Sequence, residues 1–84
     1  MAEKKLIGKI THYFPKVGVA VVELTDTIKI GDKISIEGRG NVTEQTVESM
    51  EVEHEKIEIA NAGDEIGLKV KDKVKDGDQV FKVE

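Results

Sequence analysis

The chain has 84 residues, no cysteine and a formal net charge of -4 at pH 7. A chain of this length forms one small core, which apolar packing and hydrogen bonds must hold without disulfides or thiolate-bound zinc. The negative charge and the single arginine argue against indiscriminate nucleic-acid binding. We expect residues 1–5 to be a flexible N-terminus and residues 6–84 to form a single domain. Without a signal-like or membrane-length apolar run, the sequence predicts a cytoplasmic protein without a membrane partner.

Apolar residues alternate with polar ones along the chain, and no window keeps the spacing of an amphipathic helix, so we predict an all-β fold. The first strand is expected over residues 6–12, with Leu6, Gly8 and Ile10 on one face, and a turn ends it. The second strand is expected over residues 19–24. It has apolar side chains on both faces, as in a strand that is covered on both sides or one that closes a small barrel.

The third strand is predicted over residues 33–37, where Ile34 and Ile36 point inward. The residues predicted to point outward are Lys33, Ser35 and Glu37. A flexible glycine-rich turn, residues 38–41, follows it.

The fourth strand is predicted from about residue 43 to residue 52. In this segment Val47 has the opposite parity from Met50 and Val52, so a regular strand cannot bury all three. A bulge near residues 48–49 would resolve this conflict.

The remaining strands are predicted at residues 57–59, at a segment that places Ile66, Leu68 and Val70 on one face, and at residues 79–83. About six or seven short strands with frequent turn signals are typical of a sandwich or a small barrel. A closed antiparallel barrel is favoured because closure removes exposed strand edges.

Three segments share a Gly-Asp pair, a polar or charged residue and then a β-branched residue: residues 29–34, 61–66 and 75–80. Glycine adopts a positive φ at little cost, and aspartate bonds nearby backbone, so each segment predicts a turn followed by a strand. This interpretation makes Asp32, Asp64 and Asp78 turn residues rather than a carboxylate cluster.

Residues 7–10, 28–36, 62–68 and 77–80, in this order, resemble domain 2 of the translational GTPases such as elongation factor Tu. Residues 45–60 look even more like the small C-terminal barrel of collagenase-like peptidases. Standalone translation elongation factor-like proteins of this size are the closest overall likeness. The resemblance implies a closed barrel of the translation-protein domain 2 type. The chain has no Gly-x-x-x-x-Gly-Lys-Ser/Thr phosphate loop, so we expect no GTPase activity and no bound nucleotide.

Four lysines occupy alternate positions: Lys69, Lys71, Lys73 and Lys75. If the strand continues past Val70, they project from one face and can follow a phosphate backbone. The alternative is a solvated face whose lysines protect a strand edge. Arg39, between two glycines, is a second candidate for pairing with phosphate, or else an ordinary exposed turn residue.

A row of glutamates complements these lysines: Glu51, Glu53 and Glu55. Side chains two residues apart on a strand do not converge on one point, so pairing with the lysines or solvation is favoured over a metal site. We predict no metal and no cofactor.

Aromatic side chains gather at one predicted strand end, in His12, Tyr13 and Phe14. Exposed aromatics of this kind anchor protein partners or stack on bases, whereas the structural alternative is that Tyr13 and Phe14 close the end of the barrel. His12 and His54 are the two histidines, and nothing marks a base and nucleophile pair, so we predict no catalytic residue and no enzyme.

The sequence therefore predicts a non-catalytic binding module that engages tRNA, ribosomal RNA or a protein of the translation machinery, as a monomer or with weak self-association. The alternative is a protein-interaction or accessory barrel like the one appended to collagenase-like peptidases.

Overall fold

The computed structural model describes residues 3–83. Its strands are β1 (Lys4–Phe14), β2 (Val19–Leu24), β3 (Ile28–Lys29), β4 (Lys33–Gly38), β5 (Asn41–Thr46), β6 (Met50–Val52), β7 (Glu55–Ile57), β8 (Ile59–Ala60), β9 (Glu65–Lys69) and β10 (Gln79–Val83). Residues 3–83 contain no helix, and so none that could span a membrane. The predicted all-β class is confirmed.

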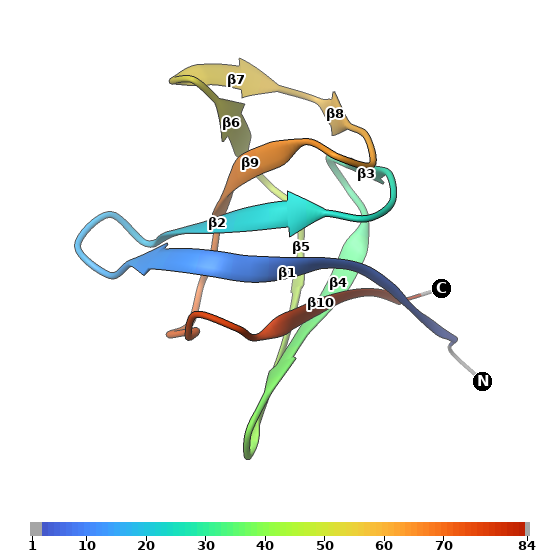
Figure 1. The fold of residues 1–84 in the computed structure, drawn as a ribbon, viewed down its shortest axis with the longest axis vertical. Helices are drawn as coiled ribbons and strands as arrows, with labels where there is room; N and C mark the ends of the chain where they lie inside the picture. The colour runs from blue at the N-terminus through green and yellow to red at the C-terminus, as the bar shows by residue number, and fades with distance from the viewer. Residues whose placement is uncertain (1–2, 84) are drawn as a thin grey trace.

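Eight of the strands form one antiparallel sheet in the order β5-β4-β10-β1-β2-β9-β6-β7, while β3 and β8 form a separate pair. The sheet curves strongly, so that β1 and β2 lie across β4 and β5 in Figure 1. Its order is linear, with β5 and β7 as the two end strands. The prediction of a closed barrel is therefore wrong in this respect.

The Gln45 side chain links β5 to the end of β9, two strands that do not pair in the sheet. Gln45 on β5 is 6% exposed and points inward opposite Ile34. Its Nε2 donates to the Lys69 carbonyl at 2.9 Å, and its Oε1 accepts from the Lys71 N–H at 2.9 Å. These two bonds satisfy backbone groups at the end of β9 without a ladder between β5 and β9.

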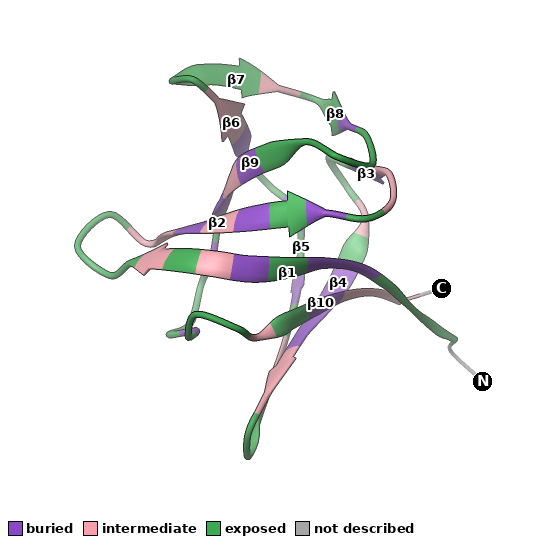
Figure 2. Ribbon diagram, in the orientation of Figure 1, coloured by how far each residue is buried: buried purple, intermediate pink, exposed green. Residues whose placement is uncertain are grey.

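The core is almost entirely aliphatic, and Figure 2 shows that its buried residues are spread over most of the strands. Predicted inward residues Ile34 and Ile36 are buried, as are Ile66, Leu68 and Val70. Strands β2 and β10 have the predicted bounds. On β2 the buried residues alternate with half-buried or exposed ones, so that strand is covered fully on one face and partly on the other.

Strand β1 begins at Lys4, ahead of the predicted start, and changes register against β10 between Leu6 and Gly8. As a result Ile7 is fully buried and Leu6 is 44% exposed, which contradicts the prediction that Leu6 shares one face with Ile10. Gly8 allows the close approach of β2, because a Cβ there would meet the carbonyl oxygen of Glu23 at 2.9 Å.

The predicted fourth strand is two strands, β5 and β6, separated by residues 47–49. The conflict between the positions of Val47 and Met50 is resolved near the predicted bulge, but the strand is interrupted there instead of bulging. Val47 leaves the sheet to donate its N–H to the Asp32 carbonyl and to accept from the Gly31 N–H. Val47 and Met50 are thereby both buried, and Val52 packs against the same core.

Candidate functional site

The three Gly-Asp segments form the same turn. In each, the aspartate N–H donates to the carbonyl three residues earlier, and its Oδ2 accepts from that residue's N–H, at 3.0 Å for Asp32 and 2.9 Å for Asp64 and Asp78. The preceding glycines have φ of 94°, 91° and 91°, the geometry of a type II turn. The predicted role of the three aspartates as turn residues is confirmed.

Each turn also pairs with a buried residue of a distant segment. The glycine N–H donates to that residue's carbonyl, and that residue's N–H donates to the aspartate carbonyl. The buried residues are Val47 for the first turn, Leu24 for the second and Ile10 for the third. The repeated phrase is therefore a structural unit that closes the fold at three places.

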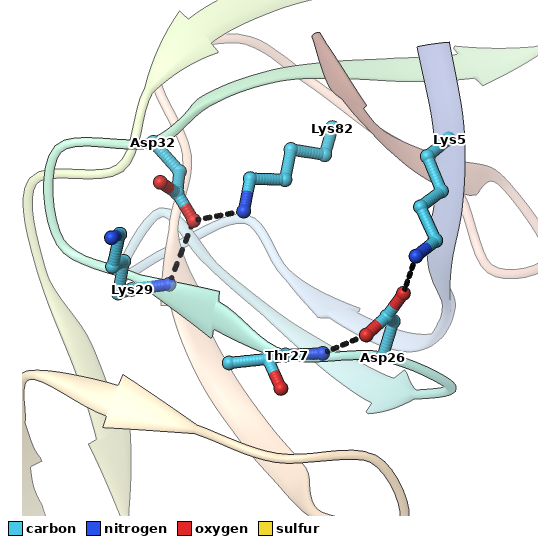
Figure 3. A network of polar contacts seen from close by, with 6 residues as sticks. All are labelled: Lys5, Asp26, Thr27, Lys29, Asp32 and Lys82. Atoms are coloured by element: carbon cyan, nitrogen blue, oxygen red, sulfur yellow. Dashed lines mark hydrogen bonds and ion pairs between the residues drawn. The ribbon is translucent and has the colours of Figure 1, made fainter. Parts of the chain in front are cut away.

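The first turn carries an additional ion pair, drawn in Figure 3. Asp32 Oδ2 lies 3.4 Å from the Lys82 Nζ of β10, and the Asp32 side chain is only 9% exposed. Nearby, Lys5 Nζ lies 2.6 Å from Asp26 Oδ2, and Asp26 Oδ1 accepts from the Thr27 N–H at 2.7 Å. These contacts attach β1 and β10 to the connection between β2 and β4.

A second network of polar contacts joins β1 to β4. Lys4 of β1 and Glu37 of β4 form an ion pair, although β10 lies between these two strands in the sheet. The Lys4 Nζ is 2.6 Å from Glu37 Oε2, which also accepts from the Ser35 hydroxyl at 3.0 Å. The hydrogen bond from Lys4, with a smaller one from Ser35, lowers the pKa of Glu37. Hydrogen bonds from Lys5 and then Thr27 lower the pKa of Asp26.

The four lysines do not form the predicted row on one strand. Strand β9 ends at Lys69, and the chain bends at residues 71–72. Lys69 Nζ donates to the Val17 carbonyl at 2.9 Å, and Lys71 Nζ lies 3.3 Å from Glu48 Oε1. The condition for the lysine row, a strand that continues past Val70, is therefore not met. The glutamate that pairs with Lys71 is Glu48, which precedes the row Glu51, Glu53 and Glu55.

Lys75 instead lines the same hollow as Arg39, the second predicted candidate for pairing with phosphate. Both line a hollow of about 650 Å³ between the tip of the β4–β5 hairpin and the third Gly-Asp turn. Lys9 of β1 lines it as well, and no sequence signal pointed to this lysine because it lies far from the others along the chain. We call this space the β4–β5 hollow.

The aromatic residues at the end of β1 divide between core and surface. Tyr13 packs against the core, as the structural alternative expected. Phe14 is 45% exposed and Val17, in the following turn, is 58% exposed. Because Phe14 is exposed, it does not close the end of a barrel. Its ring instead lies 4.7 Å from the His12 ring, measured between centroids.

A second hollow of about 670 Å³ lies between residues 29–30, 48–50 and 56–58. Its lining mixes Glu48 and Glu58 with Lys29 and Lys56. Among residues 3–83, no group of three or more histidine, cysteine or acidic side chains is arranged to hold a metal ion. The row Glu51, Glu53, Glu55 runs through the β6–β7 hairpin.

The β6–β7 hairpin closes through a two-residue turn of Glu53 and His54, with φ of 50° and 67°. This is the type I′ geometry, which strongly favours asparagine and glycine. Two residues with side chains in the left-handed region carry local backbone strain.

Comparison with known proteins relates this fold to peptidases. The chain is 40% identical over 76 residues to an uncharacterized protease of Methanocaldococcus jannaschii, a match that covers 89% of this chain and 19% of that protein. It is 35% identical over 82 residues to a collagenase of Porphyromonas gingivalis, covering 95% of this chain and 23% of the collagenase. The chain thus spans about a fifth of the length of the curated relatives it matches. No family model matches the chain.

A solved structure shows which part of such a protein shares this fold. The C-terminal domain of a Geobacillus thermoleovorans protein assigned to the U32 peptidases superposes with a TM-score of 0.86 and 21% identity, covering 93% of this chain and 91% of that domain. The predicted likeness to the barrel of collagenase-like peptidases is supported. These matches give no support to the likeness to translation factors.

Proposed function

We propose that the chain is a non-catalytic accessory domain that binds a protein partner, like the domain carried by collagenase-like peptidases. The observation that carries this proposal is the coverage of the sequence matches. They include nearly all of this chain but only about a fifth of the protease and collagenase relatives. A match to so small a part of each relative supports the role of an accessory domain rather than that of a catalytic domain.

The exposed tip of the β1–β2 hairpin is the proposed contact surface. Phe14 and Val17 present apolar side chains to solvent, while the hydrogen bond from Lys69 to the Val17 carbonyl fixes the tip. An exposed aromatic on a rigid support loses little entropy on binding, which is the property of an interface anchor. His12, beside the Phe14 ring, adds a polar group at the rim, and Tyr13 supports the tip from the core.

The alternative of RNA binding through the four lysines has less support. Lys69 and Lys71 are engaged by Val17 and Glu48 within the chain, and the bend after β9 separates the remaining lysines from a common strand face. Binding of a translation-machinery component would need a different surface.

The test is binding of this chain to a purified collagenase-like peptidase from which the C-terminal domain has been removed, measured by titration calorimetry with nuclease-treated proteins. We expect a saturable complex that Phe14→Ser weakens by about tenfold or more. Val42→Ser is the matched control, because Val42 is 62% exposed on β5, an end strand that does not pair with β1 or β2. Absence of a complex, or equal losses for both variants, would refute the proposal. Recovery of RNA without protein in a pull-down would favour the alternative.

A further inference from the structure

The β4–β5 hollow brings together three cations from three separate parts of the chain. Lys9 comes from β1, Arg39 from the tip of the β4–β5 hairpin, and Lys75 from the third Gly-Asp turn. All three side chains are exposed. Within residues 3–83, none of the three side chains takes part in an ion pair or a side-chain hydrogen bond.

The hollow also has three carboxylates, and two of them take part in hydrogen bonds within the chain. Glu37 accepts from Lys4 and Ser35. Asp78 accepts the Lys75 backbone N–H through Oδ2, and its Oδ1 is held against the α-carbon of Gly38, where no Cβ would fit. Asp76 is the lining carboxylate with no such contact in the described part of the chain. Because Glu37 is paired with Lys4, the lining retains three cations and two carboxylates, Asp76 and Asp78, without an ion-pair partner among residues 3–83.

The chemistry of the lining indicates which anion suits this space. We propose that the β4–β5 hollow binds a phosphate group through Arg39, Lys75 and Lys9. A guanidinium presents paired donors that match phosphate oxygens, and two ammonium groups add charge for a dianion. The volume of about 650 Å³ is within the range of small-ligand sites. Because the lining has no aromatic or branched aliphatic side chain, it offers no surface for stacking a base.

The third Gly-Asp turn positions one side of this site. Its backbone is fixed by the Asp78 carboxylate and by pairing of Gly77 and Asp78 with Ile10, next in the chain to Lys9. The turn thus fixes the backbone from which Lys75 projects, relative to the strand that carries Lys9, before any ligand arrives, which reduces the entropy lost on binding.

The experiment is a titration of the full chain with pyrophosphate at low salt, followed by amide and guanidinium nitrogen–proton spectra. We expect saturable shifts at Arg39 Nε–H and in residues 75–78. Arg39→Gln and Lys75→Gln should each weaken binding by about fivefold. Lys33→Gln, which removes the same charge at the opposite end of β4, should leave the affinity unchanged. Melting curves of the exposed-site variants should match the parent.

A short oligouridine distinguishes the two sources of the phosphate. If the phosphate that binds the β4–β5 hollow belongs to a nucleic-acid backbone, the oligouridine should bind more tightly than pyrophosphate and with a steeper salt dependence. If it is a free phosphate compound, the oligomer should not displace pyrophosphate. The proposal is overturned if no saturable shift appears at the hollow, or if Lys33→Gln weakens binding as much as Arg39→Gln. A negative result here leaves the protein-partner test at Phe14 unaffected.

Discussion

The Gly-Asp turns and the β6–β7 turn reverse the chain with opposite choices of residue. Each Gly-Asp turn places glycine at the position of positive φ and uses the aspartate carboxylate to bond the backbone. The β6–β7 turn places Glu53 and His54 at positive φ, and no side-chain hydrogen bond of either residue is among those found in residues 3–83.

The difference follows from what each turn is attached to. A Gly-Asp turn pairs with a buried residue of another segment, so an error in its geometry would disturb the core. The β6–β7 turn closes a hairpin at the end of the sheet, where Glu53 and His54 are exposed and strain is confined locally. The first kind of turn should therefore tolerate substitution poorly, and the second should accept improvement.

The largest effect is expected at the first turn. Asp32→Ala removes a hydrogen bond to the Lys29 N–H and leaves the Lys82 ammonium without its carboxylate. We expect a loss of about 2 kcal/mol in the free energy of unfolding, measured by denaturant titration. Asp64→Ala, which removes only the turn bond, is the control and should cost about 1 kcal/mol. Equal losses would show that the ion pair to Lys82 contributes nothing.

The second largest effect is expected from the positive φ of a turn glycine. Gly63 has φ of 91° and open space where a Cβ would lie, so Gly63→Ala introduces no clash and changes only the cost of the backbone conformation. We expect a destabilisation of about 1 kcal/mol, seen as a lower midpoint of denaturation. An unchanged midpoint would mean that the turn relaxes to a negative φ, and would weaken the contrast with the β6–β7 turn.

A gain is expected at the β6–β7 turn. The double variant Glu53→Asn/His54→Gly provides the residues that type I′ turns favour, and should stabilise the protein by about 0.5 to 1 kcal/mol. Thermal unfolding monitored by circular dichroism would detect the increase. If the double variant is less stable than the parent, the side chains of Glu53 and His54 make contributions that outweigh their backbone strain.

The smallest effect is expected from exposed carboxylates that lie outside these turns. The pKa values of Asp26 and Glu37 are lowered in the folded protein, mainly by hydrogen bonds from Lys5 and Lys4. The unfolded chain therefore binds more protons in mild acid, and this stability is present above the ordinary carboxyl pKa and lost as pH falls through the folded values. A pH series of unfolding midpoints should fall slightly below about pH 4. Asp26→Asn should flatten the decline, and an unaltered slope would contradict the role of Lys5.

Local chemistry explains which parts of the fold were predictable. The bounds of β2 and β10 and the roles of the three Gly-Asp turns depend on alternation and on glycine and aspartate preferences, which act within a few residues. The exposure of Leu6 depends on its register against β10, at the other end of the chain. Closure of the barrel was mispredicted because the Gln45 amide takes the place of a strand ladder, and nothing in the residues around Gln45 indicates this.

The candidate sites differ in the same way. The aromatic cluster was visible because His12, Tyr13 and Phe14 are consecutive. The β4–β5 hollow was not, because Lys9 and Arg39 meet Lys75 only through the sheet order that places β10 between β1 and β4.

The pairing of the Gly-Asp turns with buried residues has a consequence for how the chain folds. Val47 lies shortly after its turn, Leu24 lies well before the second, and the third turn pairs with Ile10 across nearly the whole chain. Closing a longer loop costs more entropy, and many distant pairings slow folding. Since β10 follows the third turn and sits between β1 and β4, the sheet cannot be completed until β10 has been synthesised. The emerging chain should therefore expose the edges of β1 and β4 until β10 joins them.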